Sequence, residues 1–166
     1  VVAYGHQPSA STQSMPAASA ICTALNEAAP DLKTLLVGGH VTSLPKRTLE
    51  EEDVDFVSGG EGPITLVELT QALLTGRTEE LAKVRGLWYR DGEKIRSTAA
   101  APLIQNLEQE MPEMAWDLLP MDKYRARNWH CFGDLNRQPY AAIYTTLGCP
   151  YHCTFCCIQA PFKEGA

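Results

Sequence analysis

Three cysteines near the end of the chain, Cys149, Cys153 and Cys156, follow the spacing CxxxCxxC. Cysteines clustered this tightly, in a chain without other secretory signs, favour a metal site over disulfides. Iron–sulfur clusters are held by cysteine thiolates, and an electron-transfer cluster usually takes four of them. Three thiolates from one short loop therefore predict a cluster with one iron left open for a substrate or cofactor. Gly148 and Pro150, on either side of the first cysteine, suit a turn at the end of a strand.

Three other interpretations of this loop stay open. On a helix the cysteines would share one face and could be small buried residues. A structural zinc site is possible if a fourth ligand completes the tetrahedron. A plain electron-transfer cluster is possible if Cys157 or Cys131 supplies a fourth thiolate. The candidate fourth ligands for zinc are Cys157, His152, Cys131 and His130.

The loop resembles the signature of the radical S-adenosylmethionine (SAM) enzymes, which is CxxxCxxC with an aromatic residue just before the last cysteine. Phe155 fills that place. The resemblance implies that the loop follows the first strand of a (β/α) barrel, here residues 141–146. It also implies a four-iron (4Fe-4S) cluster on the three cysteines, with SAM on the fourth iron and its adenine near the Phe155 backbone. Reductive cleavage of SAM would then give a 5′-deoxyadenosyl radical that abstracts hydrogen from a small-molecule substrate.

Composition narrows the class of protein. The chain has 166 residues, 45% hydrophobic and 20% charged, which is typical of a soluble globular domain with a core. Its net charge is −6, and no block of Lys or Arg indicates a nucleic-acid partner. No apolar run approaches the roughly 18–20 residues of a membrane span, and no signal-peptide pattern occurs at the start. The clustered cysteines indicate a reducing compartment, and we expect the cytoplasm.

The ends of the chain predict a fragment. It begins on an apolar run without Met and stops ten residues after Cys156. A (β/α)₈ barrel needs about 200 or more residues. We therefore expect a piece cut at both ends, without most of the barrel and unable to turn over substrate by itself.

The stretch before the cysteine loop alternates apolar strands with helices, which predicts a parallel α/β sheet. We expect strands at 1–4, 35–37 and 54–57. One helix should begin at Pro16, with Ser14 as its N-cap, and end before Pro30. Its predicted apolar stripe is Ala17, Ile21, Ala24, Leu25 and Ala28.

A second helix should begin at Pro63, with Gly76 just past its end. Its apolar residues are Ile64, Leu66, Val67, Leu73 and Leu74, with Thr70 among them. Beyond the sheet, the pair Asp91–Gly92 predicts a type I′ turn in a β-hairpin over 86–96.

Polar or glycine-rich loops follow each expected strand, at 5–14, 38–40 and 59–62. Ligands of parallel sheets bind outside the carboxyl ends of the strands, where glycine lets the backbone approach closely. None of the three loops matches G-x-G-x-x-G or a P-loop.

The stretch from the 38–40 loop to the 59–62 loop resembles the cobalamin-binding domain that precedes the barrel in one radical SAM subfamily. The resemblance implies that the loops accept the nucleotide tail of cobalamin, and that methylcobalamin could deliver a methyl group to a substrate radical. The cobalt-ligating Asp-x-His-x-x-Gly motif of that family does not occur in this chain. His6 and His40 are therefore interpreted as loop histidines rather than cobalt ligands. The cofactor contacts implied are Ser11, Ser14, Gly38, Gly39, Gly60, Glu61 and Gly62.

The expected organisation is a Rossmann-like cobalamin-binding domain with its hairpin at 1–97, a linker at 98–139, and the start of a radical SAM domain at 140–166. Trp116, Tyr124 and Trp129 of the linker should be packing anchors rather than a cofactor stack. The resemblance implies a radical SAM enzyme that depends on cobalamin and on an external electron donor of the flavodoxin or ferredoxin type. No catalytic side chain is assigned. The alternative is a non-catalytic cobalamin- or iron–sulfur-binding module.

Overall fold

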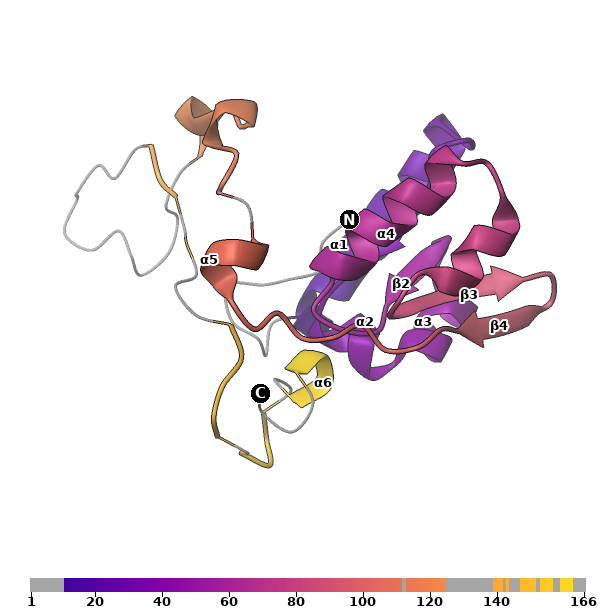
Figure 1. Cartoon of the computed structure of the whole chain (residues 1–166). Coiled ribbons are helices and arrows are strands. Elements are labelled where there is room, and N and C mark those ends of the chain that lie inside the picture. Colours follow the sequence, from indigo (N-terminus) through magenta and orange to yellow (C-terminus); the bar gives the residue numbers. More distant parts are fainter. Residues whose placement is uncertain are drawn as a thin grey trace. The chain divides into compact units, whose positions relative to one another are not determined.

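The computed structural model describes residues 11–111, 113–124, 139–141, 143, 147–151, 153–156 and 159–162. The chain divides into two compact units, Val1–Leu103 with Gly148–Ala166, and Ile104–Leu147. The first unit is an α/β domain (Figure 1). The strand expected at 1–4 and the residues 5–10, including His6, lie outside the described residues.

The described part of the first unit contains β1 (Leu35–Leu36), β2 (Phe56–Ser58), β3 (Leu87–Asp91) and β4 (Lys94–Ser97). Its helices are α1 (Ser11–Ala28), α2 (Gly39–Ser43), α3 (Pro45–Glu51), α4 (Pro63–Leu74) and α6 (Gln159–Phe162), with a 3₁₀ helix η2 (Thr78–Lys83). The second unit contains α5 (Leu107–Glu110) and the 3₁₀ turns η3 (Trp116–Leu118) and η4 (Met121–Lys123). In this unit Trp116 is half-buried and Tyr124 is exposed.

The four strands form one sheet in the order β1-β2-β3-β4. β1 and β2 are parallel, whereas β3 is antiparallel to both of its neighbours. The sheet is therefore mixed, because the hairpin predicted to lie beyond it pairs with β2 and extends it. Within the hairpin Asp91 pairs with Lys94, so the loop consists of Gly92 and Glu93. The prediction that Asp91 and Gly92 are the two turn residues is therefore wrong by one position.

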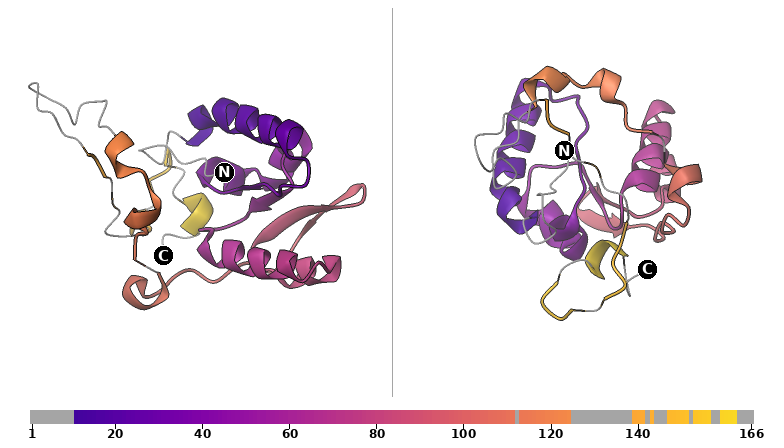
Figure 2. Two further views of the ribbon diagram at one scale, coloured as in Figure 1. Left: turned by 90° about the horizontal axis from the view of Figure 1, so that it is seen from above. Right: turned by 90° about the vertical axis from the view of Figure 1, so that its left-hand side faces the viewer.

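Helices cover both faces of this sheet, and Figure 2 (right) shows α1 and α4 on opposite sides of it. Neighbouring strand residues point to opposite faces, so Leu36 packs with the α1 side and Leu35 with the α4 side. The core on the α1 side consists of Met15, Ala18, Cys22, Leu36, Val41, Leu49, Val54 and Val57. The core on the α4 side consists of Leu35, Phe56, Leu69, Ala72, Val84 and Leu87.

Helix α1 differs from its prediction in both start and buried face. It includes Ser11 and carries Pro16 in its interior, so Ser14 is not its N-cap. Proline has no N–H for the carbonyl four residues back, which is why the sequence favoured a start there. The buried residues are Met15, Ala18 and Cys22, whereas Ile21 of the predicted stripe is 49% exposed. The predicted stripe is therefore wrong.

Helix α4 begins at Pro63 as predicted, and Gly76 lies just past its end with φ 67°. Its buried residues are Thr65, Leu69 and Ala72. Several of the apolar residues expected on this helix lie on its outer face instead, namely Leu66, Val67, Leu73 and Leu74.

The pairing of β1 with β2 is reinforced by Thr34 and Asp55 at the start of the two strands. The Asp55 carboxylate accepts hydrogen bonds from the Thr34 backbone N–H (2.9 Å) and from its hydroxyl (3.0 Å). Lys33 Nζ lies 3.0 Å from the other carboxylate oxygen. Burial of the Asp55 carboxyl works to raise its pKa, but the hydrogen bonds from Thr34 and Lys33 outweigh it, so the pKa lies below its ordinary value.

A second tether joins the hairpin to the α1 side of the sheet. The Arg90 guanidinium of β3 donates to the backbone carbonyls of Leu49, Glu52 and Val54, at and beyond the end of α3. The last carbonyls of a helix have no partner within it, and a cation at this end is favourable. Arg90 thereby fixes the end of α3 against β3.

We predict that Asp55→Asn lowers the free energy of unfolding at pH 7 by about 1.5–3 kcal/mol, the usual contribution of hydrogen bonds to a charged group. Because the pKa of Asp55 is lowered by folding, its stabilisation is present above the unfolded-state pKa of about 3.9 and is lost as pH falls through the folded-state value. Urea unfolding between pH 7 and pH 2 measures this. Asp53→Asn, in the exposed loop, is the control, and identical pH slopes for wild type and Asp55→Asn would contradict the prediction.

Candidate functional site

The parallel pairing of β1 and β2 brings two glycine-containing segments to the same edge of the sheet. The Thr42 hydroxyl, on α2, donates to the carbonyls of Ser58 (3.1 Å) and Gly60 (3.4 Å) in the segment after β2. Gly62 lies against Val37, the residue that follows β1. The structure therefore places the predicted segments 38–40 and 59–62 together, and we call them the glycine edge.

Two glycines of this edge are required by the fold itself. Gly38 has φ 146° and is the N-cap of α2, while Gly39 is buried and begins that helix, so the predicted 38–40 loop is a helix start. Gly62 has φ 108°, and a Cβ there would lie 2.5 Å from Val37 Cγ1. Positive φ strains any other residue.

The other two glycines of this edge, Gly59 and Gly60, differ in what surrounds them. A Cβ on Gly59 would lie 2.9 Å from Trp88 Nε1, so packing requires this glycine. A Cβ on Gly60 would meet no atom of the described residues within 4 Å. In this part of the chain, packing therefore gives no reason for the open space above the Gly60 backbone. Glu61, beside it, is half-buried.

The predicted serine contacts lie on a helix rather than in a loop. Ser11 and Ser14 belong to α1, so the predicted loop over 5–14 is wrong at its end. The same end of α1 reaches the glycine edge through Thr12, whose Oγ1 lies 3.0 Å from Nδ1 of His40. Sequence reasoning missed Thr12 and Thr42, because a threonine gives no signal that distinguishes a contact across the sheet edge from solvent exposure.

Ser58, the last residue of β2, contributes an unusual hydroxyl. It is 0% exposed, and its Oγ has no hydrogen-bond partner among the described residues. It alternates with Val57 and shares a sheet face with Phe56, so it points to the α4 side. A buried hydroxyl without a hydrogen-bond partner lowers the stability of the fold. Among the described residues Ser58 is such a group, next to the glycine edge.

The cysteine loop has local geometry that fits part of its prediction. Gly148 adopts φ 79° just before Cys149, as a turn there requires. The Cys156 N–H donates to the Cys153 carbonyl at 3.0 Å, which closes a turn around Phe155. Phe155 is 90% exposed. The three cysteines are free thiols, of which Cys153 is exposed and the other two are half-buried.

Cys22 is buried, in contrast to the three cysteines of the loop. It is 0% exposed in the core on the α1 side. Burial raises the pKa of its thiol, so it stays protonated and inert.

The described part of the cysteine loop is not arranged as a metal centre. Within the described residues, no three His, Cys, Asp or Glu side chains are grouped so that they could hold a metal ion. Of the predicted barrel strand at 141–146, Ala141 and Ile143 belong to no strand, and the other positions lie outside the described residues. Also outside them are Trp129, His130, Cys131, His152 and Cys157.

After the cysteine loop, the chain returns to the α/β domain. Helix α6 packs against α2, the helix that begins at the glycine edge. Phe162, at the end of α6, is only 7% exposed. The cysteine loop and the glycine edge therefore belong to the same compact unit.

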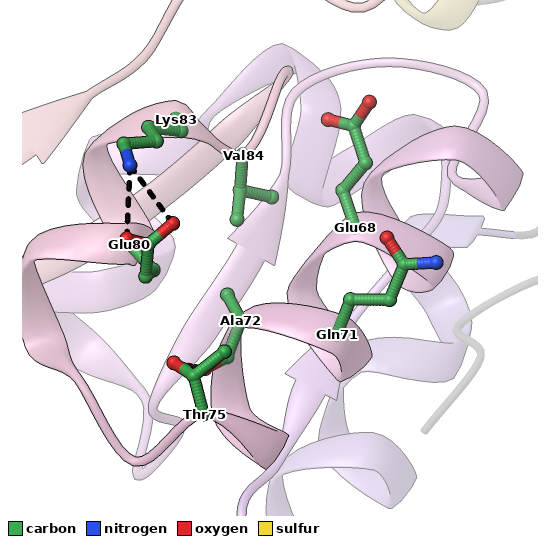
Figure 3. A pocket seen from close by; sticks show the side chains of 7 residues that line it. All are labelled: Glu68, Gln71, Ala72, Thr75, Glu80, Lys83 and Val84. Carbon is green, nitrogen blue, oxygen red and sulfur yellow. Dashed lines mark hydrogen bonds and ion pairs between the residues drawn. The ribbon is translucent and has the colours of Figure 1, made fainter.

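A shallow recess of about 210 Å³ lies elsewhere, between the carboxyl-terminal half of α4 and η2 (Figure 3). Its charged lining is already neutralised, because Glu80 pairs with Lys83 at 2.9 Å and with Arg77 at 3.1 Å. Glu68 pairs with Arg85. The recess is at the opposite end of α4 from the glycine edge and is not the candidate site. Among the helices that the structure describes, none is both long and apolar enough to cross a membrane.

The chain is similar to known enzymes. It is 40% identical over 128 residues to an uncharacterized methyltransferase of Pyrococcus horikoshii, covering 76% of this chain and 25% of that protein. It is 33% identical over 132 residues to the anaerobic magnesium-protoporphyrin IX monomethyl ester cyclase of Cereibacter sphaeroides, covering 78% and 20%. It is 29% identical over 147 residues to the cytidylyl-2-hydroxyethylphosphonate methyltransferase of Streptomyces wedmorensis, covering 76% and 27%. No family model matches the chain.

The chain spans between a fifth and somewhat over a quarter of the length of these relatives. Their names, two methyltransferases and a cyclase, support a relation to enzymes and agree with the resemblance of the cysteine loop to radical SAM proteins. The similarity thus supports a radical SAM-related protein.

We predict that Ser58→Ala raises the free energy of unfolding by about 1 kcal/mol, because it removes a buried hydroxyl that has no hydrogen-bond partner among the described residues. Thermal or urea unfolding of the 166-residue chain measures it. Thr65→Val is the matched control. The equally buried Thr65 hydroxyl donates to the Arg85 carbonyl at 2.8 Å, so its removal should lower the free energy of unfolding. A loss of stability in Ser58→Ala as large as in Thr65→Val would refute the prediction.

Proposed function

We propose that this chain provides two cofactor sites of a cobalamin-dependent radical SAM enzyme, with C-methyl transfer as the reaction of the full-length protein. The glycine edge accepts cobalamin, and Cys149, Cys153 and Cys156 hold a four-iron cluster. The observation that carries the proposal is the CxxxCxxC loop, with its turn at Cys153–Cys156, in the same compact unit as the glycine edge. The similarity to two methyltransferases supports the choice of reaction.

The donor set of the loop suits an iron–sulfur cluster. Three thiols without disulfide partners stand on one loop, and thiolates are the ligands that such clusters take. Partial exposure of all three leaves them reachable for cluster insertion, unlike Cys22. When bound, the cluster would supply the electron that cleaves SAM to a 5′-deoxyadenosyl radical. The chain's share is to hold three irons and leave the fourth without a protein ligand.

The glycine edge suits a large, flat-sided cofactor. Gly60 leaves room for a ligand to lie directly on the backbone, and this room has no packing explanation within the described residues. The Thr42 hydroxyl contacts the Gly60 carbonyl, and Thr12 and His40 contact each other where α2 begins. When bound, cobalamin would supply the methyl group for transfer. The chain binds and orients the cofactor, while the cofactors carry the difficult chemistry.

Gly60→Val tests the cobalamin site. We expect it to weaken hydroxocobalamin binding at least tenfold, because the new side chain would fill the space that the ligand needs. Stability should not fall by more than about 1 kcal/mol, since no atom of the described residues lies within 4 Å of the new Cβ and φ is not positive. Absorbance titration and urea unfolding measure the two quantities.

Gly62→Ala serves as the contrast for Gly60→Val. It should lose stability through the close approach to Val37 and the positive φ. Cobalamin binding that is unchanged in Gly60→Val would remove the glycine edge as the cofactor site.

Anaerobic reconstitution with iron and sulfide, followed by electron paramagnetic resonance (EPR), tests the cluster site. We expect a reduced four-iron signal that shifts when SAM is added and is lost in Cys153→Ala, because SAM must occupy an iron without a protein ligand. Cys157→Ala, one residue beyond the last predicted ligand, should leave the signal unchanged.

The same experiment separates the alternatives. A cluster signal indifferent to SAM, and lost in Cys157→Ala, would favour a non-catalytic iron–sulfur module with four thiolates. Stoichiometric zinc without iron uptake would overturn the cluster proposal.

A further inference from the structure

Helix α2 begins within the first segment of the glycine edge and contacts the second. It begins at Gly39, contacts α1 through His40, and reaches the segment after β2 through Thr42. We propose that Thr42 is a positioning residue that fixes the Gly59–Gly62 turn to receive the nucleotide tail of cobalamin. This inference rests on the proposed function and assigns a role to a residue that the sequence pattern does not single out.

The Thr42 hydroxyl bonds outside its own helix, as the Thr65 hydroxyl of α4 does with the Arg85 carbonyl. Ser43 donates to the Gly39 carbonyl at 2.8 Å, and Thr48 and Thr70 also donate to the carbonyl four residues back in their own helices. Such bonds stay local and hold nothing across the fold. Thr42 instead crosses to Ser58 and Gly60. Its hydroxyl therefore links α2 to two residues that lie 16 and 18 positions further along the chain.

Two further contacts hold the ends of the turn. The Gly59 N–H donates to the Gly86 carbonyl at 2.7 Å, and the Gly62 carbonyl accepts from the Leu66 N–H at 2.8 Å. Between them, no atom of the described residues lies within 4 Å of the place that a Cβ on Gly60 would take. The Thr42 hydroxyl adds a link from α2 to the carbonyls of Ser58 and Gly60, at the start of the turn and within it.

This placement predicts selectivity for one part of the ligand. Cobalamin carries a nucleotide tail, whereas cobinamide is the same corrin ring without the phosphate, ribose and base. If the Gly59–Gly62 turn receives the tail, a displaced turn should weaken binding of cobalamin and leave binding of cobinamide almost unchanged. A general loss of folding would weaken both ligands alike.

The experiment titrates the 166-residue chain and its Thr42→Val and Thr42→Ser variants with hydroxocobalamin and with cobinamide. Thr42→Val keeps the shape of the side chain but not the hydroxyl, and we expect about tenfold weaker cobalamin binding, the effect of one or two modest hydrogen bonds. Its cobinamide affinity should change less than twofold. Thr42→Ser keeps the hydroxyl and should restore cobalamin binding to near the wild-type value.

Thr70→Val is the matched control, because it removes a threonine hydroxyl that makes a local bond within α4, to the Leu66 carbonyl. Thr42→Val that binds cobalamin as wild type does, or that loses both ligands equally, would overturn the role of Thr42 while leaving the cobalamin site standing. Wild-type chain that binds neither ligand would instead defeat the proposed cobalamin function, and the inference with it.

Discussion

The parallel pairing of β1 with β2 is the contact on which the arrangement of this domain depends. It is very short, with Leu35 opposite Phe56 and Leu36 opposite Val57. So few ladder bonds would hold poorly alone, and side chains reinforce both ends. Thr34 and Asp55 clamp the beginning, where a part-buried carboxylate accepts charge-assisted hydrogen bonds. Thr42 joins the segments at the other end.

This pairing gives the glycine edge its shape, because the carboxyl ends of parallel strands open at the same edge. The glycines there are needed for different physical reasons. Gly38 and Gly62 have positive φ angles, and Gly59 makes room for Trp88. Within the described residues, neither reason applies to Gly60. The space over Gly60 is therefore open to a ligand among the described residues, and the Thr42 hydroxyl of α2 contacts the Gly60 carbonyl.

The cysteines of this chain divide by environment. Cys22 is enclosed by apolar residues, where desolvation disfavours the thiolate and removes its reactivity. Cys149, Cys153 and Cys156 stand on a turn-rich loop that keeps them at least partly accessible. Identical side chains thus serve packing in one place and could serve ligation in the other. The difference comes from how much water each thiol can reach.

The features that could be predicted from the residues alone are those controlled by interactions between near neighbours in the chain. Pro63 and Gly76 bounded α4, the hairpin formed in the predicted stretch with its loop one position later than predicted, and Gly148 took the backbone conformation that a turn before Cys149 needs. Tertiary structure decided which helix face is buried. Two apolar stripes were available on α1, and packing on the sheet selected Met15, Ala18 and Cys22 over the stripe with Ile21. It also paired the hairpin with β2 and aimed the Thr42 hydroxyl across the edge. These outcomes depend on contacts between residues far apart in the chain, which local spacing does not encode.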